Sequence, residues 1–417
     1  MFNKLKPKSE FSRNVLTLMT GTTIAQAIPI AISPILTRIY TPEDFGLFAL
    51  YMSVASILSV VATGRYELAI MLPKKDEDAI NIVALSIIIS FFVSFISFLL
   101  VFFLNVQITN LLGNPEISSW LYFIPLTVLL TGIYQSFNYW SNRKKQYKRL
   151  ATSRVVQSGT TATTNLGMGF GNMGSSGLIL GSLFGQGVAT TVLGRMIWGE
   201  DRNRIKDVNK LKIFALLRQY NQFPKFDIMA SLLNVLSQQS IYILFNILFN
   251  STVSGYYYLT QRTLGLPMIV ISSAISDVFK EEASKNFKKY GNAKNIYKET
   301  FQKLVVLGFM ISLILYFFAI DIFRVLFGKE WIIAGEYVQI LTPLLFIKFI
   351  ASPLSFMFYV GGKQQLNLYS QFLFLISIIY SFLVSDNTYE VLNNIVMLFS
   401  GIYLYYLYVS ARIAKVF

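Results

Sequence analysis

Cysteine and histidine are both missing from the 417 residues. Without cysteine the chain has no disulfide framework and no thiol chemistry. Without either residue, imidazole relays, thiolate or imidazole metal sites, and Ser-His or Cys-His nucleophilic pairs are all excluded. Together with the polar path described below, for which no reaction is implied, these absences lead us to expect no catalytic residue, no metal site, no cofactor and a protein that is not an enzyme.

Charged residues are also scarce. They make up 14% of the chain against 54% hydrophobic residues, and the mean hydropathy is +0.53. Soluble domains carry about 25% charged and roughly 45–50% apolar residues. This composition predicts a polytopic membrane protein. The basic N-terminus with its apolar stretch resembles a cleaved signal, but the apolar run continues past the would-be cleavage point, so we expect it to stay as the first span.

Apolar segments long enough to cross a bilayer recur along the whole chain. A window of about 19 residues finds twelve of them. They cover about residues 14–37, 46–64, 80–104, 119–140, 153–172, 177–197, 226–248, 255–277, 300–320, 337–359, 367–385 and 391–411. The even number places both termini on one side. The loops on the opposite side are short, the longest being residues 321–336, so no folded external domain is expected.

Basic residues set the predicted orientation. Outside the spans, the only Lys and Arg residues on the side opposite the termini are Arg38, Arg324 and Lys329. The excess on the other side places both termini in the cytoplasm by the positive-inside rule. The net charge of +15 is therefore a topology signal and not a nucleic-acid footprint. The four tryptophans fall at predicted span edges and are expected to anchor at the membrane interfaces.

An internal repeat predicts two halves. LLGNPEISSWLYFIPL from Leu111 resembles LFGKEWIIAGEYVQILTPL from Leu326. This similarity indicates that a unit of six spans has been duplicated in the same orientation. We expect an all-α fold of twelve transmembrane helices in two six-helix bundles, related by a pseudo-two-fold axis along the membrane normal. The lobes are predicted at 1–199 and 226–417. Residues 200–225, with apolar residues at helical spacing, are predicted to be an amphipathic linker on the inner surface.

The first two spans, residues 14–60, form a predicted helical hairpin with one polar face that lines a path. Its break reads TPEDFG, in which Thr41 is the expected N-cap, Pro42 lies in the first turn, and Glu43 and Asp44 favour the positive end of the helix dipole. Small residues at Gly177, Gly181 and Gly185 predict close helix packing in the sixth span.

Ionisable residues inside a span are functional candidates because they are costly to bury. Lys348 lies midway along the tenth span and Arg262 two turns into the eighth, whereas Arg38 and Arg65 flank the first hairpin. Each has a structural alternative, an internal ion pair or an interface anchor. Asp227 is the candidate for binding a coupling ion. Amides add hydrogen-bonding capacity: Gln26, Gln135, Asn138, Asn234, Gln238, Gln239 and Asn246. We predict a cationic, polar path for an anionic cargo, bound by Lys348, Arg262, Arg38, Arg65, Gln26 and Asn138.

The segments PILTRIYTPEDFGLFALY from Pro34 and GRYELAIMLPKKDEDA from Gly64 resemble the polysaccharide flippases of the multidrug/oligosaccharidyl-lipid/polysaccharide exporter superfamily. The resemblance implies movement of undecaprenyl-diphosphate-linked oligosaccharide, an O-antigen or capsule repeat unit, from the inner to the outer leaflet by alternating access. It further implies a bacterial cytoplasmic membrane location, with membrane lipids, a polysaccharide polymerase and chain-length machinery as candidate partners.

Two alternatives stay open. A cation-coupled multidrug exporter of the same superfamily shares the plan, but such exporters commonly use an acid in the first span, which this chain lacks. A polysaccharide polymerase is the enzyme alternative, and the short external loops argue against it.

Overall fold

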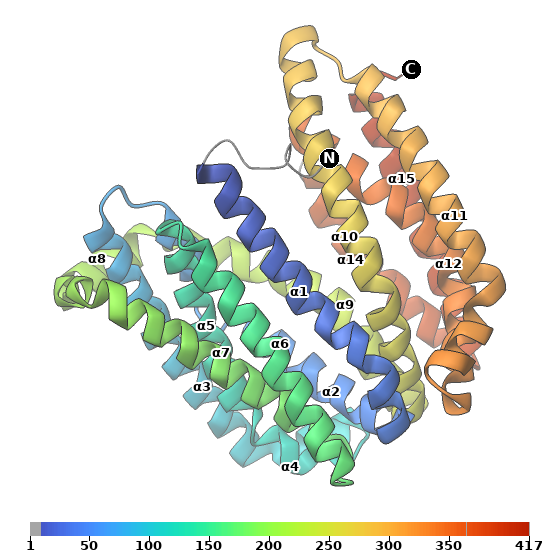
Figure 1. The fold of residues 1–417 in the computed structure, drawn as a ribbon, viewed down its shortest axis with the longest axis horizontal. Helices are drawn as coiled ribbons and strands as arrows, with labels where there is room; N and C mark the ends of the chain where they lie inside the picture. The colour runs from blue at the N-terminus through green and yellow to red at the C-terminus, as the bar shows by residue number, and fades with distance from the viewer. Residues whose placement is uncertain (1–9, 364, 417) are drawn as a thin grey trace. The chain divides into compact units, whose positions relative to one another are not determined.

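The computed structural model describes residues 10–363 and 365–416, and no strand occurs among them (Figure 1). The predicted all-α fold is therefore confirmed. The chain divides into two compact units, residues Met1–Val235 and Leu236–Phe417. We describe each unit by itself. The division predicted from the sequence, with lobes at 1–199 and 226–417 and a linker between them, remains a prediction.

Unit 1 contains six long helices and several short ones. They are α1 (Glu10–Ile39), α2 (Pro42–Ser59), the 3-10 helix η2 (Tyr66–Met71), α3 (Asp76–Leu112), α4 (Ile117–Leu121), α5 (Ile124–Arg143), α6 (Tyr147–Phe170), α7 (Ser175–Asp201), the 3-10 helix η3 (Arg202–Asp207), α8 (Lys210–Gln219) and the π-helical turn η4 (Phe223–Asp227). The first turns of α9 (Ile228–Leu248) complete it. Packing pairs α1 with α6, α6 with α7, and α3 with α5.

Unit 2 continues from α9 with a similar series. It contains α10 (Ser251–Tyr290), α11 (Lys294–Leu326), the 3-10 helix η5 (Lys329–Trp331), α12 (Ile332–Leu354), α13 (Met357–Val360), α14 (Gln365–Leu383) and α15 (Thr388–Ile413). The repeat seen in the sequence has a local counterpart. Gly113 after α3 and Gly328 after α11 both have positive φ, 69° and 104°, and each precedes a short helix.

Every predicted span coincides with a helix of at least 18 residues in the described part of the chain. Among the residues that the structure describes, eight helical segments are long and apolar enough to cross a membrane by length and composition alone. The four remaining spans correspond to α2, α6, α10 and α14, which are shorter or more polar. Such helices are tolerated in a bilayer where they face other helices or a wet cavity.

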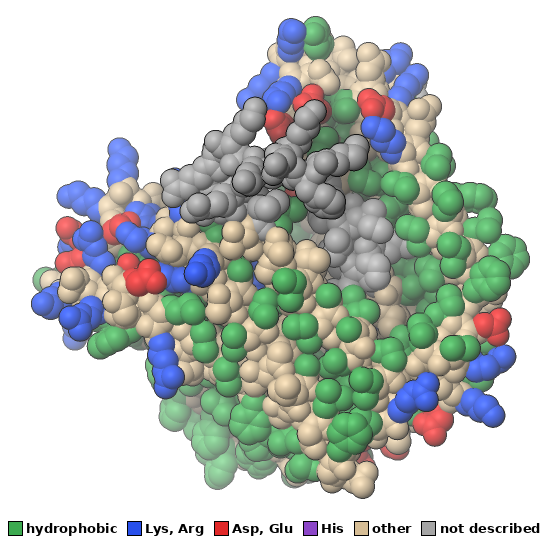
Figure 2. All heavy atoms as spheres, in the orientation of Figure 1, with side chains coloured by type: hydrophobic (Ala, Val, Ile, Leu, Met, Phe, Trp, Pro, Cys, Tyr) green, Lys and Arg blue, Asp and Glu red, His purple; other side chains and the backbone are tan. Residues whose placement is uncertain are grey.

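The surface of α3 has the polarity that a lipid environment requires. Phe91, Phe92 and Phe95 are each more than half exposed, whereas Ser90 and Ser94 on the same helix are buried. In water this arrangement would be inverted, so the chain is a multi-pass membrane protein. In the view of Figure 2, hydrophobic side chains are spread over the middle and lower part of unit 1, and Lys and Arg gather over the end that carries α8.

The predicted start of α2 is confirmed. Thr41 is the N-cap, its hydroxyl oxygen accepts from the backbone amide of Asp44 at 3.2 Å, and the Asp44 carboxylate accepts from the Thr41 amide at 2.9 Å. This reciprocal capping box fixes where α1 ends and α2 begins. The polar face of α1 serves packing in part, because Arg154 on α6 donates to the Thr22 hydroxyl at 2.7 Å.

Close packing of α6 and α7 is also confirmed. A Cβ atom placed on Gly181 would collide with the Asn165 side chain, and one on Gly185 would collide with Thr161. Only glycine permits this approach of the two helices.

The tryptophan prediction was wrong for two of the four residues. Trp140 and Trp331 are fully buried within the protein. Trp140 donates from its indole nitrogen to Asp201 at 3.1 Å, and the Trp331 ring meets Tyr256 edge to face. Both therefore pack the interior of their units. Position along a span gives depth in the membrane but not which side of the helix meets lipid.

Candidate functional site

A cavity of about 560 Å³ lies within unit 1. Its walls come from one face of α2, one face of α5, the first turns of α9 and the turn that follows α2. The lining residues are Met52, Ala55, Ser56, Ser59, Val60, Arg65, Thr127, Thr131, Gln135, Ala230, Ser231, Asn234 and Val235. Pockets of roughly 300–1,000 Å³ are typical of small-ligand sites.

Helical periodicity explains the two main walls. Met52, Ser56 and Ser59 recur along α2 at intervals of three and four residues, and Thr131 and Gln135 recur along α5 at four. Residues at these spacings share one face of a helix. The cavity therefore presents hydroxyl and amide groups, which can hydrogen-bond a hydroxylated or phosphorylated ligand in either direction.

Two contacts hold these walls in place. The Tyr51 hydroxyl and the Thr127 hydroxyl are 2.6 Å apart and join α2 to α5. A Cβ atom on Gly132 would collide with the Ser90 side chain, so α5 lies directly against α3. The wall that carries Thr131 is therefore held against both α2 and α3.

Arg65 is the one charged residue among the described residues that line the cavity. Gly64 and Arg65 both adopt left-handed backbone conformations, with φ of 59° and 62°. This conformation costs a side-chain-bearing residue energy, and such residues often mark functional sites. The turn places the guanidinium at the cavity, where a planar fork of donors suits phosphate oxygens.

Glu67 lies behind Arg65 and is 1% exposed. Its Oε1 is 3.2 Å from Arg65 Nη1, and its other oxygen accepts from the Thr63 hydroxyl. The carboxylate therefore orients the guanidinium and offsets part of its charge. The next residue, Tyr66, donates its hydroxyl to the Leu217 carbonyl on α8 at 2.9 Å. Burial raises the Tyr66 pKa above its ordinary value.

Arg65 is the one member of the predicted substrate-binding set that lines this cavity. Gln26 is half-buried on α1, Arg38 is exposed in the last turn of α1, and Asn138 on α5 accepts a hydrogen bond from Asn142 at 3.0 Å. The predicted coupling-ion residue Asp227 ends the turn η4, which packs against η2. It is thus near the Arg65 turn without lining the cavity.

Two predicted cations belong to unit 2. Arg262 on α10 donates to the Tyr258 hydroxyl at 3.3 Å. Lys348 lies in the middle of α12, and no carboxylate lies within ion-pair distance of it among the residues that the structure describes. The roles of both as binding residues remain predictions.

The cavity also contains residues that the sequence did not single out. Gln135 and Asn234 were noted as polar residues within spans, but Ser56, Ser59 and Thr131 were not. Single hydroxyls are common in membrane helices, where they often bond to their own helix backbone. The available signal was their three- and four-residue spacing, which becomes specific only once α2, α5 and α9 are known to be neighbours.

The comparisons with known proteins agree with a membrane transporter fold. A family described as "Polysaccharide biosynthesis protein" matches residues 35–335. No curated protein matches the chain in sequence.

Three solved structures are similar over nearly the full length. An inward-facing multidrug resistance transporter of the MATE family, in the MOP superfamily, has a TM-score of 0.63 and 14% identity, covering 97% of this chain and 95% of that chain. A MOP-superfamily transporter from Pyrococcus furiosus has a TM-score of 0.64 and 14% identity, covering 97% of this chain and 96% of that chain. The MATE multidrug transporter DinF-BH has a TM-score of 0.65 and 13% identity, covering 100% of this chain and 98% of that chain. At these identities the likeness shows the fold alone.

Proposed function

We propose a flippase function for this chain, which belongs to the polysaccharide biosynthesis protein family and has the fold of MOP-superfamily transporters. In this proposal the cargo is undecaprenyl-diphosphate-linked oligosaccharide, an O-antigen or capsular repeat unit. It moves from the inner to the outer leaflet of the bacterial cytoplasmic membrane, and both termini are cytoplasmic. Membrane lipids surround the chain, and a polysaccharide polymerase with its chain-length machinery takes up the product.

The observation that supports this cargo is the composition of the cavity. One guanidinium stands among hydroxyl and amide groups, and the described residues that line the cavity include no carboxylate. A diphosphate presents two or more negative charges, and sugars present hydroxyl groups. Arg65 can bind the first, and Ser56, Thr131, Gln135 and Asn234 can hydrogen-bond the second.

The remaining predicted residues have assigned roles within the proposal. Lys348 and Arg262 supply positive charge from unit 2, while Gln26, Arg38 and Asn138 contact the cargo at other stages of its passage. Asp227 binds the coupling ion. Alternating access then requires that the cavity face one side of the membrane at a time, with the isoprenoid tail remaining in lipid.

Deletion of the gene that encodes this chain provides the test. Cells that lack it should accumulate lipid-linked oligosaccharide that a membrane-impermeant glycosidase digests in inverted vesicles but not in intact spheroplasts. Surface glycan should disappear and return with the wild-type gene. Unchanged surface glycan, in a background without a second copy, would contradict the proposal.

A multidrug exporter is the second candidate, because the fold is shared with multidrug transporters. The cavity disfavours it, since a cationic drug would meet Arg65. Efflux of organic cations from the same depleted and complemented cells distinguishes the two functions. Drug accumulation that rises when the chain is depleted and falls again on complementation, with normal surface glycan, would support the exporter.

A further inference from the structure

Four apolar side chains recur every three residues through the segment that follows α7: Ile205, Val208, Leu211 and Phe214. All four are exposed, by 40%, 38%, 80% and 54%. The same segment buries a different apolar set, because Leu216 is 7% exposed and Ile213, Leu217 and Tyr220 pack with it against α3 and η2. Helix α8 thus has two apolar faces. One is used inside unit 1, and the other is left uncovered by the described residues.

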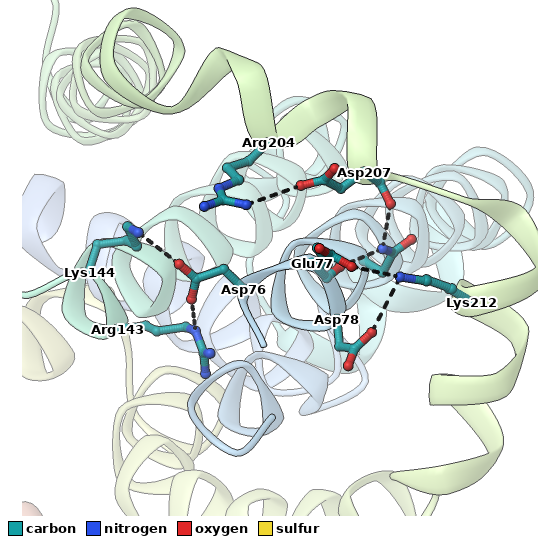
Figure 3. Close-up of polar contacts among 9 residues, drawn as sticks. Asp76, Glu77, Asp78, Arg143, Lys144, Arg204, Asp207 and Lys212 are labelled. Carbon is teal, nitrogen blue, oxygen red and sulfur yellow. Dashed lines mark hydrogen bonds and ion pairs between the residues drawn. The ribbon is translucent and has the colours of Figure 1, made fainter. Parts of the chain in front are cut away.

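The position of α8 is fixed by the first turns of α3 (Figure 3). Lys212 Nζ lies 3.3 Å from Glu77 Oε2 and 3.7 Å from Asp78 Oδ1. The fully buried Asn81 side chain donates to the Asp207 carbonyl at 2.9 Å and accepts from the Asn209 amide at 2.7 Å. These contacts attach the start of α8 to the start of α3.

The same turn of α3 marks a depth in the membrane. Its acidic residues Asp76, Glu77 and Asp78 directly precede the long apolar span, and Asp76 binds Arg143 and Lys144 at the end of α5, with distances of 3.0 and 2.8 Å. Charged side chains are costly within the hydrocarbon, so this turn lies at the boundary between lipid and water. Because α8 is attached there, its exposed apolar face lies at the same level.

Basic residues accompany the exposed face. Arg202, Lys206, Lys210 and Arg218 are all exposed and lie on η3 and α8. Helices with exposed apolar residues and flanking Lys or Arg bind at the interface of membranes that contain anionic lipids. We propose that the exposed apolar side chains of η3, α8 and the connection between them, namely Ile205, Val208, Leu211 and Phe214, insert among anionic lipid headgroups. This does not depend on the identity of the cargo.

The absence of cysteine gives a direct test with the full chain. Phe214→Cys is labelled with an environment-sensitive fluorophore and reconstituted into nanodiscs of phosphatidylcholine with or without phosphatidylglycerol. Quenching by spin-labelled lipid is compared with quenching by aqueous iodide. Phe92→Cys, on the lipid-facing side of α3, is the lipid reference, and Lys288→Cys, on the exposed end of α10, is the water reference.

We expect the label at position 214 to be quenched by spin-labelled lipid at least threefold more than the label at 288, and to be protected from iodide. Phosphatidylglycerol should strengthen both effects. The triple change Arg202→Gln, Lys206→Gln and Lys210→Gln should remove that dependence while leaving Lys212 and its attachment to α3 intact. Quenching at 214 equal to that at 288 would overturn the proposal. Protection from both quenchers would also overturn it, since a protein surface would then cover the face.

Discussion

Arg65 Nη1 lies 3.2 Å from Glu67 Oε1, with the guanidinium reaching the cavity and the carboxylate 1% exposed behind it. The guanidinium that a ligand meets in the cavity is therefore partly offset by the Glu67 carboxylate and is not a free cation. A diphosphate that binds there has to compete with the Glu67 carboxylate for the guanidinium or share it. This competition limits the affinity for the cargo. A limited affinity suits a transporter, because the cargo must also be released.

Replacement of Arg65 should have the largest effect on binding. Hydrogen bonds to charged groups contribute roughly 1.5–3 kcal/mol, so Arg65→Ala should weaken binding of a short-chain prenyl diphosphate about 10- to 100-fold. Arg65→Lys should retain part of the affinity because it keeps the charge but loses the fork. Calorimetric titration of the purified protein measures both. Arg324→Ala, on an exposed arginine, is the control and should leave affinity unchanged.

Glu67→Gln should act in the opposite direction. The amide oxygen can still accept from Thr63, but the opposing charge is gone. Glu67 is buried, but Arg65 is 24% exposed and therefore screened by solvent, so we assign about 1 kcal/mol to the competition that the carboxylate exerts. We expect roughly fivefold tighter binding of the diphosphate, with slower export in cells. The same titration measures affinity, and surface glycan measures export. Weaker binding would instead mean that Glu67 mainly holds the guanidinium in position.

Lys348 offers a test of the charge contributed by unit 2. Lys348→Ala should strongly reduce surface glycan without loss of protein from the membrane, whereas Lys348→Arg should retain most of the activity. Immunoblotting of membranes alongside glycan staining separates transport from folding. Normal export by the alanine variant would leave this residue with a structural role only.

Gly181 should tolerate no side chain. Gly181→Ala would drive a Cβ atom into Asn165 and separate α6 from α7, at a cost of roughly 1–3 kcal/mol. Gly159→Ala on α6 is the matched control, since nothing lies within 4 Å of the added atom, and alanine favours a helix over glycine by about 0.5–1 kcal/mol. Thermal unfolding in detergent, followed by size-exclusion chromatography, should show a lower midpoint for the first variant only.

Arg149 should be important for stability although it lies away from the cavity. It is 4% exposed and binds Asp201 at 2.8 Å and Glu200 at 2.5 Å. Hydrogen bonds to charged groups contribute roughly 1.5–3 kcal/mol, and the change leaves Asp201, which is 12% exposed, without its cation, so Arg149→Met should unfold at a markedly lower temperature. Lys303→Met breaks an exposed pair with Glu299 and should change stability by at most about 0.5 kcal/mol. Equal midpoints for the two variants would contradict this reading.

The sequence predicted the helices well because hydrophobic runs and caps are local signals. All twelve spans, the Thr41 capping box and the glycine contacts of α7 follow from residues close together in the chain. Arg65 was identified because it is a cation that flanks the first predicted hairpin. The other walls of the cavity were not identified, since Ser56 and Thr131 gain meaning only when α2 and α5 are placed side by side.

The buried tryptophans show that sequence position alone also assigns some residues to the wrong environment. Trp140 was placed at the membrane interface from its position at the end of a span, but it packs in the interior beside Asp201. Periodicity and length fix the depth of a residue. They do not show which neighbouring helix the residue packs against. That depends on contacts between segments distant in the sequence, such as those of Arg149 with Glu200 and Asp201.

Helices α10 and α11 are 40 and 33 residues long and meet at Gly291, which has a φ of 66°. At 1.5 Å per residue, α10 alone measures about 60 Å, roughly twice the thickness of the hydrocarbon core. The hairpin therefore projects well past the lipid as a stiff rod. The rest of this 47.4 kDa protein is largely hidden in a detergent micelle. The α10–α11 hairpin therefore gives an antibody fragment a rigid epitope, and it gives electron microscopy a feature by which particles can be aligned.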